Sequence, residues 1–432
     1  MERESLSVQA ERALVVAVLL PDSKNDPADP LAELRNLATT AGAEIVDQMI
    51  AKRRKIFPRL YVGSGKAEEI AARADANDAD IVIFDNDLSP AQIRDLEKII
   101  GRKILDRSEL ILDIFAAHAR TAESRLQVEL AQLEYTYPRL RHMWSHLERI
   151  AGGAASAAGG IGTRGPGEKQ IEIDRRLVQQ RVSALKRELE AIDKRKIRQV
   201  SGRDRMPSVC LVGYTNAGKS TAMHLLTGAD VYIADQLFAT LDTRTRKWDL
   251  GDGNEVLLSD TVGFVRSLPH HLVASFRATL EEAIWANLLI HVADASNERV
   301  LDQIDAVNEV LEDLGCKGER LLVLNKVDQI IDPTVRTVLR ARYPDAIFLS
   351  ALTGEGAADL VETVTERLLG SARHVVVEVN CANGKAMSFV HKHMTIDSET
   401  YEGAIARIEG TLPSDQLSLL TRFGDDVRII DE

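Results

Sequence analysis

Apolar runs alternate with helical patterns over about the first 115 residues of the chain. Buried strands are predicted at 13–20, from residue 44 and at 79–84, and helices at 30–41, 65–77 and 90–100. The last helix has a clear start, because Ser89 can cap it and Pro90 suits its first position. Strands that alternate with helices predict a parallel α/β domain, which we assign to residues 1–118.

Apolar residues then recur three and four positions apart along two segments, which predicts two long helices. The first segment carries Leu126, Leu130, Leu133, Tyr137, Leu140, Met143 or Trp144, Leu147 and Ile150, and the second carries Val178, Val182, Leu185, Leu189 and Ile192. The Gly/Ala-rich stretch 151–167 separates them and cannot hold regular structure by itself. We therefore predict an antiparallel helical hairpin with a flexible tip over residues 119–205. A plain oligomerising coiled coil is the alternative, but a passive connection would be short.

Strand and helix patterns alternate again from the apolar run 208–212 onwards, which predicts a second α/β domain over residues 206–370. The last segment, 371–432, is predicted to be a small α+β domain. Its strands are expected at 375–379 and 404–412, and its helices at 385–393 and after Ser414. The fold class is therefore α/β, with the helical hairpin and the small C-terminal domain added to it.

Composition narrows the possible functions. The 432 residues are 45% hydrophobic and 28% charged, and the formal net charge of −12 excludes a diffuse nucleic-acid coat. The three cysteines lie far apart without a CxxC pair, which excludes a disulfide framework or zinc site and fits a reducing cytoplasm.

No apolar run approaches the roughly 18 residues of a membrane span, and the N-terminus lacks a signal pattern. We expect a cytoplasmic protein without stable membrane insertion.

Charge is uneven along the chain. Residues 161–205 hold 13 Lys and Arg against 7 Asp and Glu. Charge alone leaves two interpretations open, a solvated helix face or a surface for a polyanion. The adjacent glycine-rich tip favours the polyanion, because backbone and arginine can approach phosphates closely there.

Residues 213–220 match the phosphate-binding pattern GxxxxGK[ST] in full, between a predicted strand and a predicted helix. The backbone N–H groups of such a loop and the N-terminus of its helix bind phosphates. Lys219 would reach the β- and γ-phosphates, and the Ser220 hydroxyl would ligate Mg²⁺. The predicted contacts are Gly213, Tyr214, Thr215, Asn216, Ala217, Gly218, Lys219 and Ser220.

A DxxG motif follows an apolar strand about 40 residues after the lysine of this loop, at Asp260, Thr261, Val262 and Gly263. Asp260 would hold Mg²⁺ through water, and the Gly263 amide would meet the γ-phosphate. A DxxG motif alone is a weak signal. Here it is a strong one, because its place after the phosphate-binding loop and a strand matches the order of motifs in nucleotide-hydrolysing P-loop proteins.

The residue after this motif is Phe264, where Ras-like enzymes place a glutamine that orients the attacking water. A phenylalanine cannot hydrogen-bond to water, so intrinsic hydrolysis is expected to be slow and to need help from a partner or an ion. Asn216 is a candidate ligand for such an ion, K⁺.

Guanine recognition is predicted at an NKxD motif, Asn325, Lys326, Val327 and Asp328, which follows the apolar run 321–324. The Asp328 carboxylate can accept two hydrogen bonds from guanine that adenine cannot supply, which favours GTP over ATP. Asn325 and Lys326 are expected to tie this loop to the phosphate-binding loop. A backbone amide at the next strand end should touch guanine O6, within Ser350, Ala351 and Leu352.

A switch threonine is expected between the phosphate-binding loop and the DxxG motif. Its hydroxyl would complete the Mg²⁺ shell only when the γ-phosphate is present. Thr240 is preferred, although Thr243 and Thr245 are rivals by chemistry. The nucleotide-binding residues here are predicted to be Phe238, Ala239, Thr240, Leu241 and Asp242.

With these motifs in place, the chain resembles the HflX family of translation-factor-type GTPases over about residues 10–370. The specific part of the resemblance is the glycine-tip signature GGIGTRGPGE at 159–168. The other matching runs are YVGSGK at 61–66, QVELAQLEY at 127–135, DRR at 174–176, FATLD at 238–242 and DTVGFV at 260–265.

The resemblance implies an N-terminal α/β domain, a helical hairpin and a P-loop GTPase domain. It also implies binding to the large (50S) ribosomal subunit, with loop 151–167 and the basic helix face directed to ribosomal RNA. Family members are linked to splitting or rescuing stalled ribosomes. The match at 238–242 favours Thr240 as the magnesium threonine. Thr243 and Leu352 depart from the proline and lysine common in the family, but neither removes a group that the chemistry needs.

We therefore predict a monomeric, Mg²⁺-dependent GTPase that binds GTP and GDP, is stimulated by the ribosome, and uses Lys219, Thr240 and Gly263 in catalysis. Its expected role is in ribosome splitting or rescue, or in subunit biogenesis, under stress. One rival is a signalling switch that acts on a protein effector, which the basic glycine tip disfavours. Another is an RNA-binding module that holds nucleotide as a structural ligand, which the complete motif set disfavours. A membrane-associated role lacks a lipidation signal.

Overall fold

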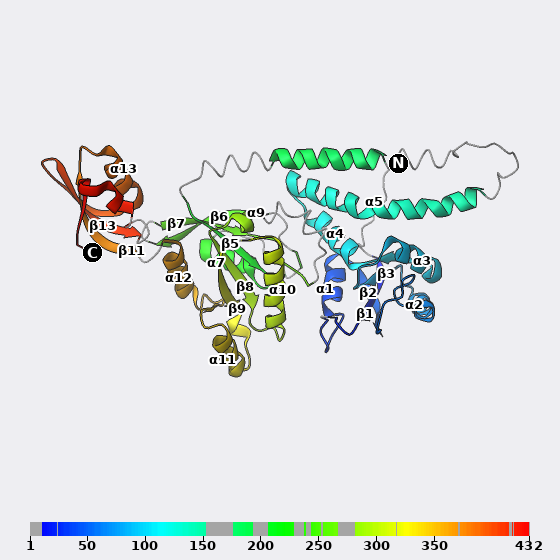
Figure 1. Cartoon of the computed structure of the whole chain (residues 1–432). Coiled ribbons are helices and arrows are strands. Elements are labelled where there is room, and N and C mark those ends of the chain that lie inside the picture. The colour runs from blue at the N-terminus through cyan, green and yellow to red at the C-terminus, as the bar shows by residue number, and fades with distance from the viewer. Residues whose placement is uncertain are drawn as a thin grey trace.

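The structure is a computed structural model that describes residues 11–23, 25–152, 176–192, 206–228, 237–238, 243–251, 254–266, 281–316, 318–369, 372–413, 417 and 419–431. Three sheets organise these residues, and Figure 1 shows them in a row from the N-terminal domain at the right to the C-terminal domain at the left. The predicted loop tip at 153–167 and the predicted cap Ser414 lie outside the described residues.

The N-terminal sheet is parallel, with strand order β2-β1-β3-β4. Its strands are β1 (Arg12–Leu19), β2 (Glu44–Lys52), β3 (Ile81–Phe84) and β4 (Lys103–Leu105). Its helices are α1 (Ala32–Thr40), α2 (Ser64–Ala76), α3 (Pro90–Ile100) and α4 (Arg107–His118). The predicted capping of α3 is present, because Ser89 and Gln92 form a reciprocal capping box.

Two hydrophobic cores form, one on each face of this sheet. Helices α2 and α3 cover one face, and α1 and α4 cover the other. The sequence did not predict β4 or α4. The strand has three residues, and the helix buries residues on nearly every side, so neither shows the periodicity of a half-exposed element.

A helical hairpin leaves this domain. Helix α5 (Ala122–Gly152) packs along the helix at 176–192, and Figure 1 shows the two side by side. Leu130, Leu185 and Leu189 are buried between them, and Arg181 pairs with Glu129 at 2.7 Å. The contact between the two helices therefore includes six of the predicted heptad positions, Leu126, Leu130, Leu133, Val182, Leu185 and Leu189.

The central sheet has six strands in the order β10-β9-β8-β5-β7-β6, parallel except for the β6–β7 pair. Its strands are β5 (Ser208–Gly213), β6 (Arg244–Gly251), β7 (Asn254–Asp260), β8 (Leu288–Asp294), β9 (Glu319–Asn325) and β10 (Ile347–Phe348). Its helices are α7 (Lys219–Thr227), α9 (Glu281–Trp285), α10 (Val300–Asp313), η1 (Val327–Gln329), α11 (Pro333–Arg342) and α12 (Ala357–Leu369). Strand β5 lies inside the sheet, so the loop after it opens at the middle of the carboxyl edge.

The C-terminal sheet is antiparallel, in the order β12-β13-β11-β14. It contains β11 (Ala372–Asn380), β12 (Thr395–Glu402), β13 (Ile405–Pro413) and β14 (Val427–Asp431), with α13 (Gly384–His393) and η2 (Thr421–Asp426). The predicted α+β character is confirmed. Strand β12 was missed because most of its residues are exposed on both faces, which removes the alternation that marks a strand.

Candidate functional site

The phosphate-binding motif forms a tight loop between β5 and α7. Gly218 adopts φ 91°, a left-handed conformation that glycine accommodates without strain, and a Cβ there would lie 2.3 Å from Asn325 Nδ2. Helix α7 begins at the next residue, Lys219, so its first N–H groups face the loop. The loop is therefore shaped to receive an anion.

Lys219 is buried, with its ammonium turned into the loop. Its Nζ donates to the carbonyl oxygens of Gly213 at 3.1 Å and Tyr214 at 2.8 Å. Burial lowers the pKa of Lys219 to about 8, against the opposing charge of Asp260. The ammonium is therefore held inside the loop by two backbone carbonyls.

Ser220 and Asp260 meet at the start of α7 and the end of β7. The Ser220 hydroxyl donates to Asp260 Oδ2 at 2.7 Å, and Asp260 is fully buried. A hydroxyl and a carboxylate are the hard oxygen donors that Mg²⁺ prefers, so these two residues fit the ion. Thr240, the predicted third participant, lies outside the described residues, as do Ala239, Leu241 and Asp242.

The segment after β7 lies directly against the phosphate-binding loop. Phe264 N donates to Gly213 O at 3.0 Å, and Thr215 N donates to Phe264 O at 2.7 Å. A Cβ on Gly263 would lie 2.8 Å from Thr215 Cα and 3.0 Å from Lys219 Nζ, so only glycine fits there. The pairing of β5 with β7 therefore continues past the strands and across the loop.

Asn325 joins three loops at the carboxyl edge. Its side-chain Nδ2 donates to Ala217 O at 2.9 Å, and its Oδ1 accepts from Ala351 N at 2.9 Å. Asp328 lies within η1, and Leu352 is exposed beyond Ala351. The loops that carry the predicted phosphate and guanine contacts are thus brought together by one buried amide.

Lys326 differs from its prediction. Its Nζ pairs with Asp294 Oδ2 at 2.7 Å, at the end of β8, rather than with the phosphate-binding loop. A left-handed backbone at Lys326, φ 61°, turns the chain from β9 into η1. The ion pair between Lys326 and Asp294 therefore ties the base loop to β8, the neighbouring strand of the sheet.

The Phe238 side chain packs into the N-terminal domain. Its ring packs edge-on against Phe115 of α4, with centroids 4.6 Å apart, and both side chains are buried. Val262 and Val265, which flank Gly263, are buried in the same hydrophobic cluster. The two segments expected to respond to nucleotide thus both contribute to the core between the N-terminal sheet, α1 and α4.

Four residues beside the site had no motif to reveal them: Glu33, Asp85, Arg107 and Arg266. Arg107, at the start of α4, donates to Glu33 Oε1 at 2.6 Å, Asp85 Oδ1 at 2.7 Å and the Arg266 carbonyl at 2.9 Å. The only signal in the sequence is that Arg266 follows the DxxG motif by three residues. The other three residues of the cluster come from three segments of the N-terminal domain that are distant in the sequence.

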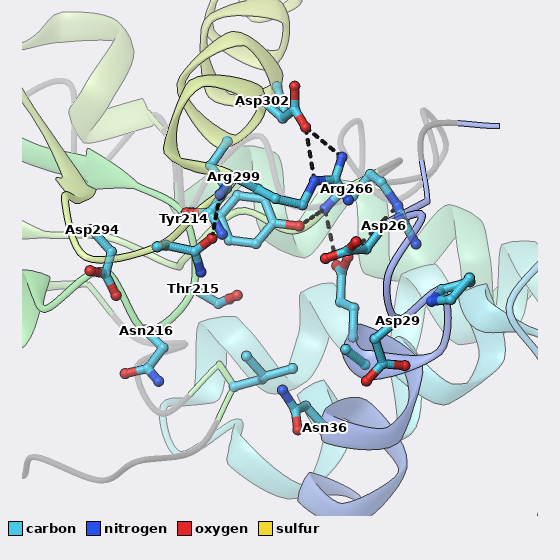
Figure 2. Close-up of a pocket in the computed structure, with 17 residues that line it drawn as sticks. Asp26, Asp29, Asn36, Tyr214, Thr215, Asn216, Arg266, Asp294, Arg299 and Asp302 are labelled. Atoms are coloured by element: carbon cyan, nitrogen blue, oxygen red, sulfur yellow. Dashed lines mark hydrogen bonds and ion pairs between the residues drawn. The ribbon is translucent and has the colours of Figure 1, made fainter. Parts of the chain in front are cut away.

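A cavity of about 240 Å³ opens beside this cluster, between α1 and the phosphate-binding loop. Figure 2 shows Tyr214, Thr215 and Asn216 of the loop on one side, and Asp29 and Asn36 on the other. The N-terminal domain and the phosphate-binding loop therefore both line this cavity.

The mainly parallel central sheet, with its phosphate loop, DxxG segment and Asn325-linked base loop, defines a P-loop GTPase. Family models described as "GTP-binding GTPase N-terminal", "GTP-binding GTPase Middle Region" and "50S ribosome-binding GTPase" match residues 28–116, 118–203 and 208–326. The chain belongs to the HflX family of GTPases, as two curated relatives show. GTPase HflX of Escherichia coli (strain K12) is 43% identical over 396 residues, 91% of each chain. GTPase HflX of Lacrimispora saccharolytica is 40% identical over 419 residues, 96% of each chain.

A solved structure with lower similarity is that of a GTP-binding protein from the archaeon Sulfolobus solfataricus in complex with GDP. It is 23% identical, covers 83% of this chain and 98% of its own, and has a TM-score of 0.41. Among the described residues of this chain, no helix is long and apolar enough to cross a membrane.

Proposed function

We propose that this chain hydrolyses GTP with Mg²⁺ and that the large ribosomal subunit binds it and stimulates the reaction. One observation carries the catalytic part. The Asn325 amide joins the phosphate loop to the base loop, beside the buried pair of Ser220 and Asp260. A nucleotide and its metal would both find their partners on this one edge of the sheet.

Each residue of the site has a proposed role that follows from its chemistry. Backbone amides of 214–220 and the Lys219 ammonium would bind the phosphates, and Ser220 and Thr240 would hold the metal. The metal would neutralise charge that develops on the phosphates. The Gly263 amide would contact the γ-phosphate, and Asp328 would accept hydrogen bonds from guanine.

Potassium is proposed as a further aid to hydrolysis, through Asn216. This residue lines the cavity at the phosphate end of the loop, where a cation could stabilise the transition state. Higher turnover in potassium than in sodium buffer would support the idea, and equal turnover in both would overturn it.

The ribosomal part rests on different features. The basic segment 161–205 adjoins the glycine-rich stretch 151–167, and the matching family model is described as a "50S ribosome-binding GTPase". We propose domains at 1–118, 119–205, 206–370 and 371–432, with the hairpin reaching ribosomal RNA. The proposed setting is a cytoplasmic monomer that acts under stress, in splitting or rescuing stalled ribosomes or in subunit biogenesis.

The test is GTP turnover with and without purified 50S subunits. It compares the unaltered chain with a variant in which residues 153–167 are replaced by a short linker. Strong stimulation of the unaltered chain and its loss in the variant would support the proposal. Turnover that 50S subunits leave unchanged would overturn the ribosomal part and favour a protein effector. Absence of turnover under both conditions would overturn the catalytic part.

A further inference from the structure

The residue that follows the DxxG motif has no group that could act on water. The Phe264 side chain is 2% exposed and lies in a core cluster with Cys210 and Val212 of β5. A ring buried in this core can neither hydrogen-bond to water nor turn towards a bound nucleotide. A side chain of this protein that orients the attacking water therefore has to come from elsewhere in the site.

Thr215 carries an unpaired hydroxyl inside the phosphate-binding loop. The residue is 7% exposed, and within the described part of the chain its Oγ1 has no hydrogen-bond partner. Buried hydroxyls almost always have a partner, because a buried hydroxyl without one has lost its hydrogen bonds to water. In a loop shaped for phosphates, an unpaired hydroxyl indicates that its partner arrives when the site is occupied.

The main chain fixes where this hydroxyl lies. The Thr215 N–H donates to the Phe264 carbonyl at 2.7 Å, and Tyr214 forms a parallel bridge with Phe264. The neighbouring hydroxyl, on Tyr214, is already engaged, because it accepts from the Arg266 backbone N at 2.7 Å. Thr215 therefore holds its hydroxyl in a set place, while that of Tyr214 is taken up by the fold.

The Thr215 side chain lies beside the two groups proposed to bind the γ-phosphate, the Lys219 ammonium and the Gly263 amide. A Cβ on Gly263 would lie 2.8 Å from Thr215 Cγ2 and 3.0 Å from Lys219 Nζ, so the three residues converge on one small region. Water attacks the γ-phosphorus in line with the bond that breaks, so the group that orients it must lie close to this phosphate. Thr215 meets that condition.

There is room for water next to this residue. Thr215 lines the cavity of about 240 Å³, and Figure 2 shows it between Tyr214 and Asn216 on the wall that the loop forms. A water molecule needs only a small part of such a volume, provided that polar groups surround it. Asn36 and Gln303 supply polar groups on the other walls. The cavity can therefore deliver water to the Thr215 hydroxyl.

We propose that Thr215 is a catalytic residue that orients the attacking water, in the role that a glutamine after the DxxG motif has in Ras-like enzymes. Its Oγ1 accepts a hydrogen bond from the water. The water oxygen forms a bond to the γ-phosphorus while the bond from this phosphorus to the bridging oxygen breaks, and the electron pair of that bond leaves with GDP. The proton of the water passes to an oxygen of the released phosphate, and Thr215 keeps its own proton. This proposal rests on the proposed GTP hydrolysis.

The test compares two substitutions in the full chain. Thr215→Val keeps the shape of the side chain and removes the hydroxyl, whereas Thr215→Ser keeps the hydroxyl. Hydrolysis of GTP is followed in single turnover with the protein in excess, and dissociation constants are measured for GDP and for a non-hydrolysable GTP analogue. The matched control is Thr363→Val on α12, whose hydroxyl donates to the Asp359 carbonyl of the same helix at 2.8 Å.

We expect the valine variant to hydrolyse bound GTP about 100-fold more slowly, the lower end of the loss when one transition-state hydrogen bond is removed. Its affinity for both nucleotides should change little, because the hydroxyl is proposed to bond to the water and not to the nucleotide. The serine variant should keep most of the rate, and the control should keep all of it.

An unchanged rate in the valine variant, or an equal loss in the valine and serine variants, would overturn this proposal and leave the proposed function standing. Weaker nucleotide binding that accounts for the whole loss of rate would also overturn it. An unaltered chain that binds GTP without hydrolysing it would overturn the proposed hydrolysis and this inference together.

Stability without nucleotide separates this role from a structural one. Because Thr215 Oγ1 is buried without a partner among the described residues, removal of the hydroxyl should leave the free energy of unfolding unchanged or increase it. Urea denaturation of the unaltered chain and of Thr215→Val would measure the difference. A valine variant that is clearly less stable than the unaltered chain would show that the hydroxyl supports the fold, and would overturn the catalytic role.

Discussion

The Asn325 side chain donates to the carbonyl of Ala217 at 2.9 Å, across 108 residues of sequence. The Oδ1 atom of the same side chain accepts a hydrogen bond from the backbone amide of Ala351. One buried side chain therefore fixes the relative position of three loops. The Asn325 side chain matters mainly because it holds the three loops in this arrangement, and less because of the strength of either hydrogen bond.

Substitution of Asn325 by alanine should therefore act on stability and on binding. It leaves the Ala217 carbonyl and the Ala351 amide unpaired in the interior, which costs about 1–3 kcal/mol of unfolding free energy. Urea denaturation and titration with GDP would measure the two effects. Asn308→Ala is a suitable control, because its side chain makes a single 3.4 Å contact with Arg320. Equal effects of the two variants would contradict the prediction.

The choice of base offers a second prediction, at Asp328. The Asp328→Asn change replaces an acceptor by a group that can donate, which suits the carbonyl that xanthine carries in place of the guanine amine. We expect affinity for GTP to fall by about 100-fold or more, while affinity for XTP rises. Competition binding with both nucleotides would test it. A variant that loses GTP without gaining XTP would indicate that Asp328 supports the loop and does not read the base.

Binding should depend on pH above neutrality through Lys219. Burial lowers its pKa to about 8, and bound phosphates favour the charged form. Binding must therefore take up a proton when the solution is more alkaline than pH 8. Affinity for GDP is expected to fall by up to about tenfold per pH unit above 8 and to be nearly constant below 7.

Calorimetry at pH 8.5 in two buffers of different ionisation enthalpy would detect the proton directly. The same burial predicts that unfolding free energy increases as pH rises from about 8 towards 10.5, since the unfolded chain holds this proton more tightly there. Binding heats that do not depend on the buffer would contradict the assignment.

The hairpin should owe its stability to leucines and little to its ion pairs. Leu185 is fully buried against α5, so Leu185→Ala is expected to destabilise the hairpin by about 2–4 kcal/mol. Arg181 and Glu129 are each more than 40% exposed, and Arg181→Ala should change little. Hydrogen exchange of residues 176–192 would compare them, and a larger effect of the arginine variant would be the contrary result.

The pattern of hydrophobic and polar residues predicted the helices and strands that turn one face to a core. The sequence motifs predicted the loops of the candidate site. Helix α3 is an example, since Ser89 and Pro90 mark its start and its apolar stripe marks its length. Helix α4 was missed because it is enclosed by the sheet, α1 and α5, which leaves no polar side to give it a period.

The cluster around Arg266 could not be predicted for a different reason. Glu33 comes from α1, Asp85 follows β3 and Arg107 begins α4, and each resembles an ordinary surface charge in its own segment. Only the packing of that domain on the GTPase domain brings them together. Phe238 is similar, because its sequence context predicts a nucleotide contact while its ring lies on Phe115.

The core shared by α1, α4 and Phe238 has a consequence for the order in which the protein is made. Synthesis produces the N-terminal sheet and both helices first, yet Phe238, Val262 and Val265 complete their packing and are translated later. The first domain emerges with an open apolar side that stays unfilled until much of the second has followed. The packing of its core is therefore completed only after the ribosome has synthesised the later segments. A chain that ends before residue 238 would keep this apolar surface exposed.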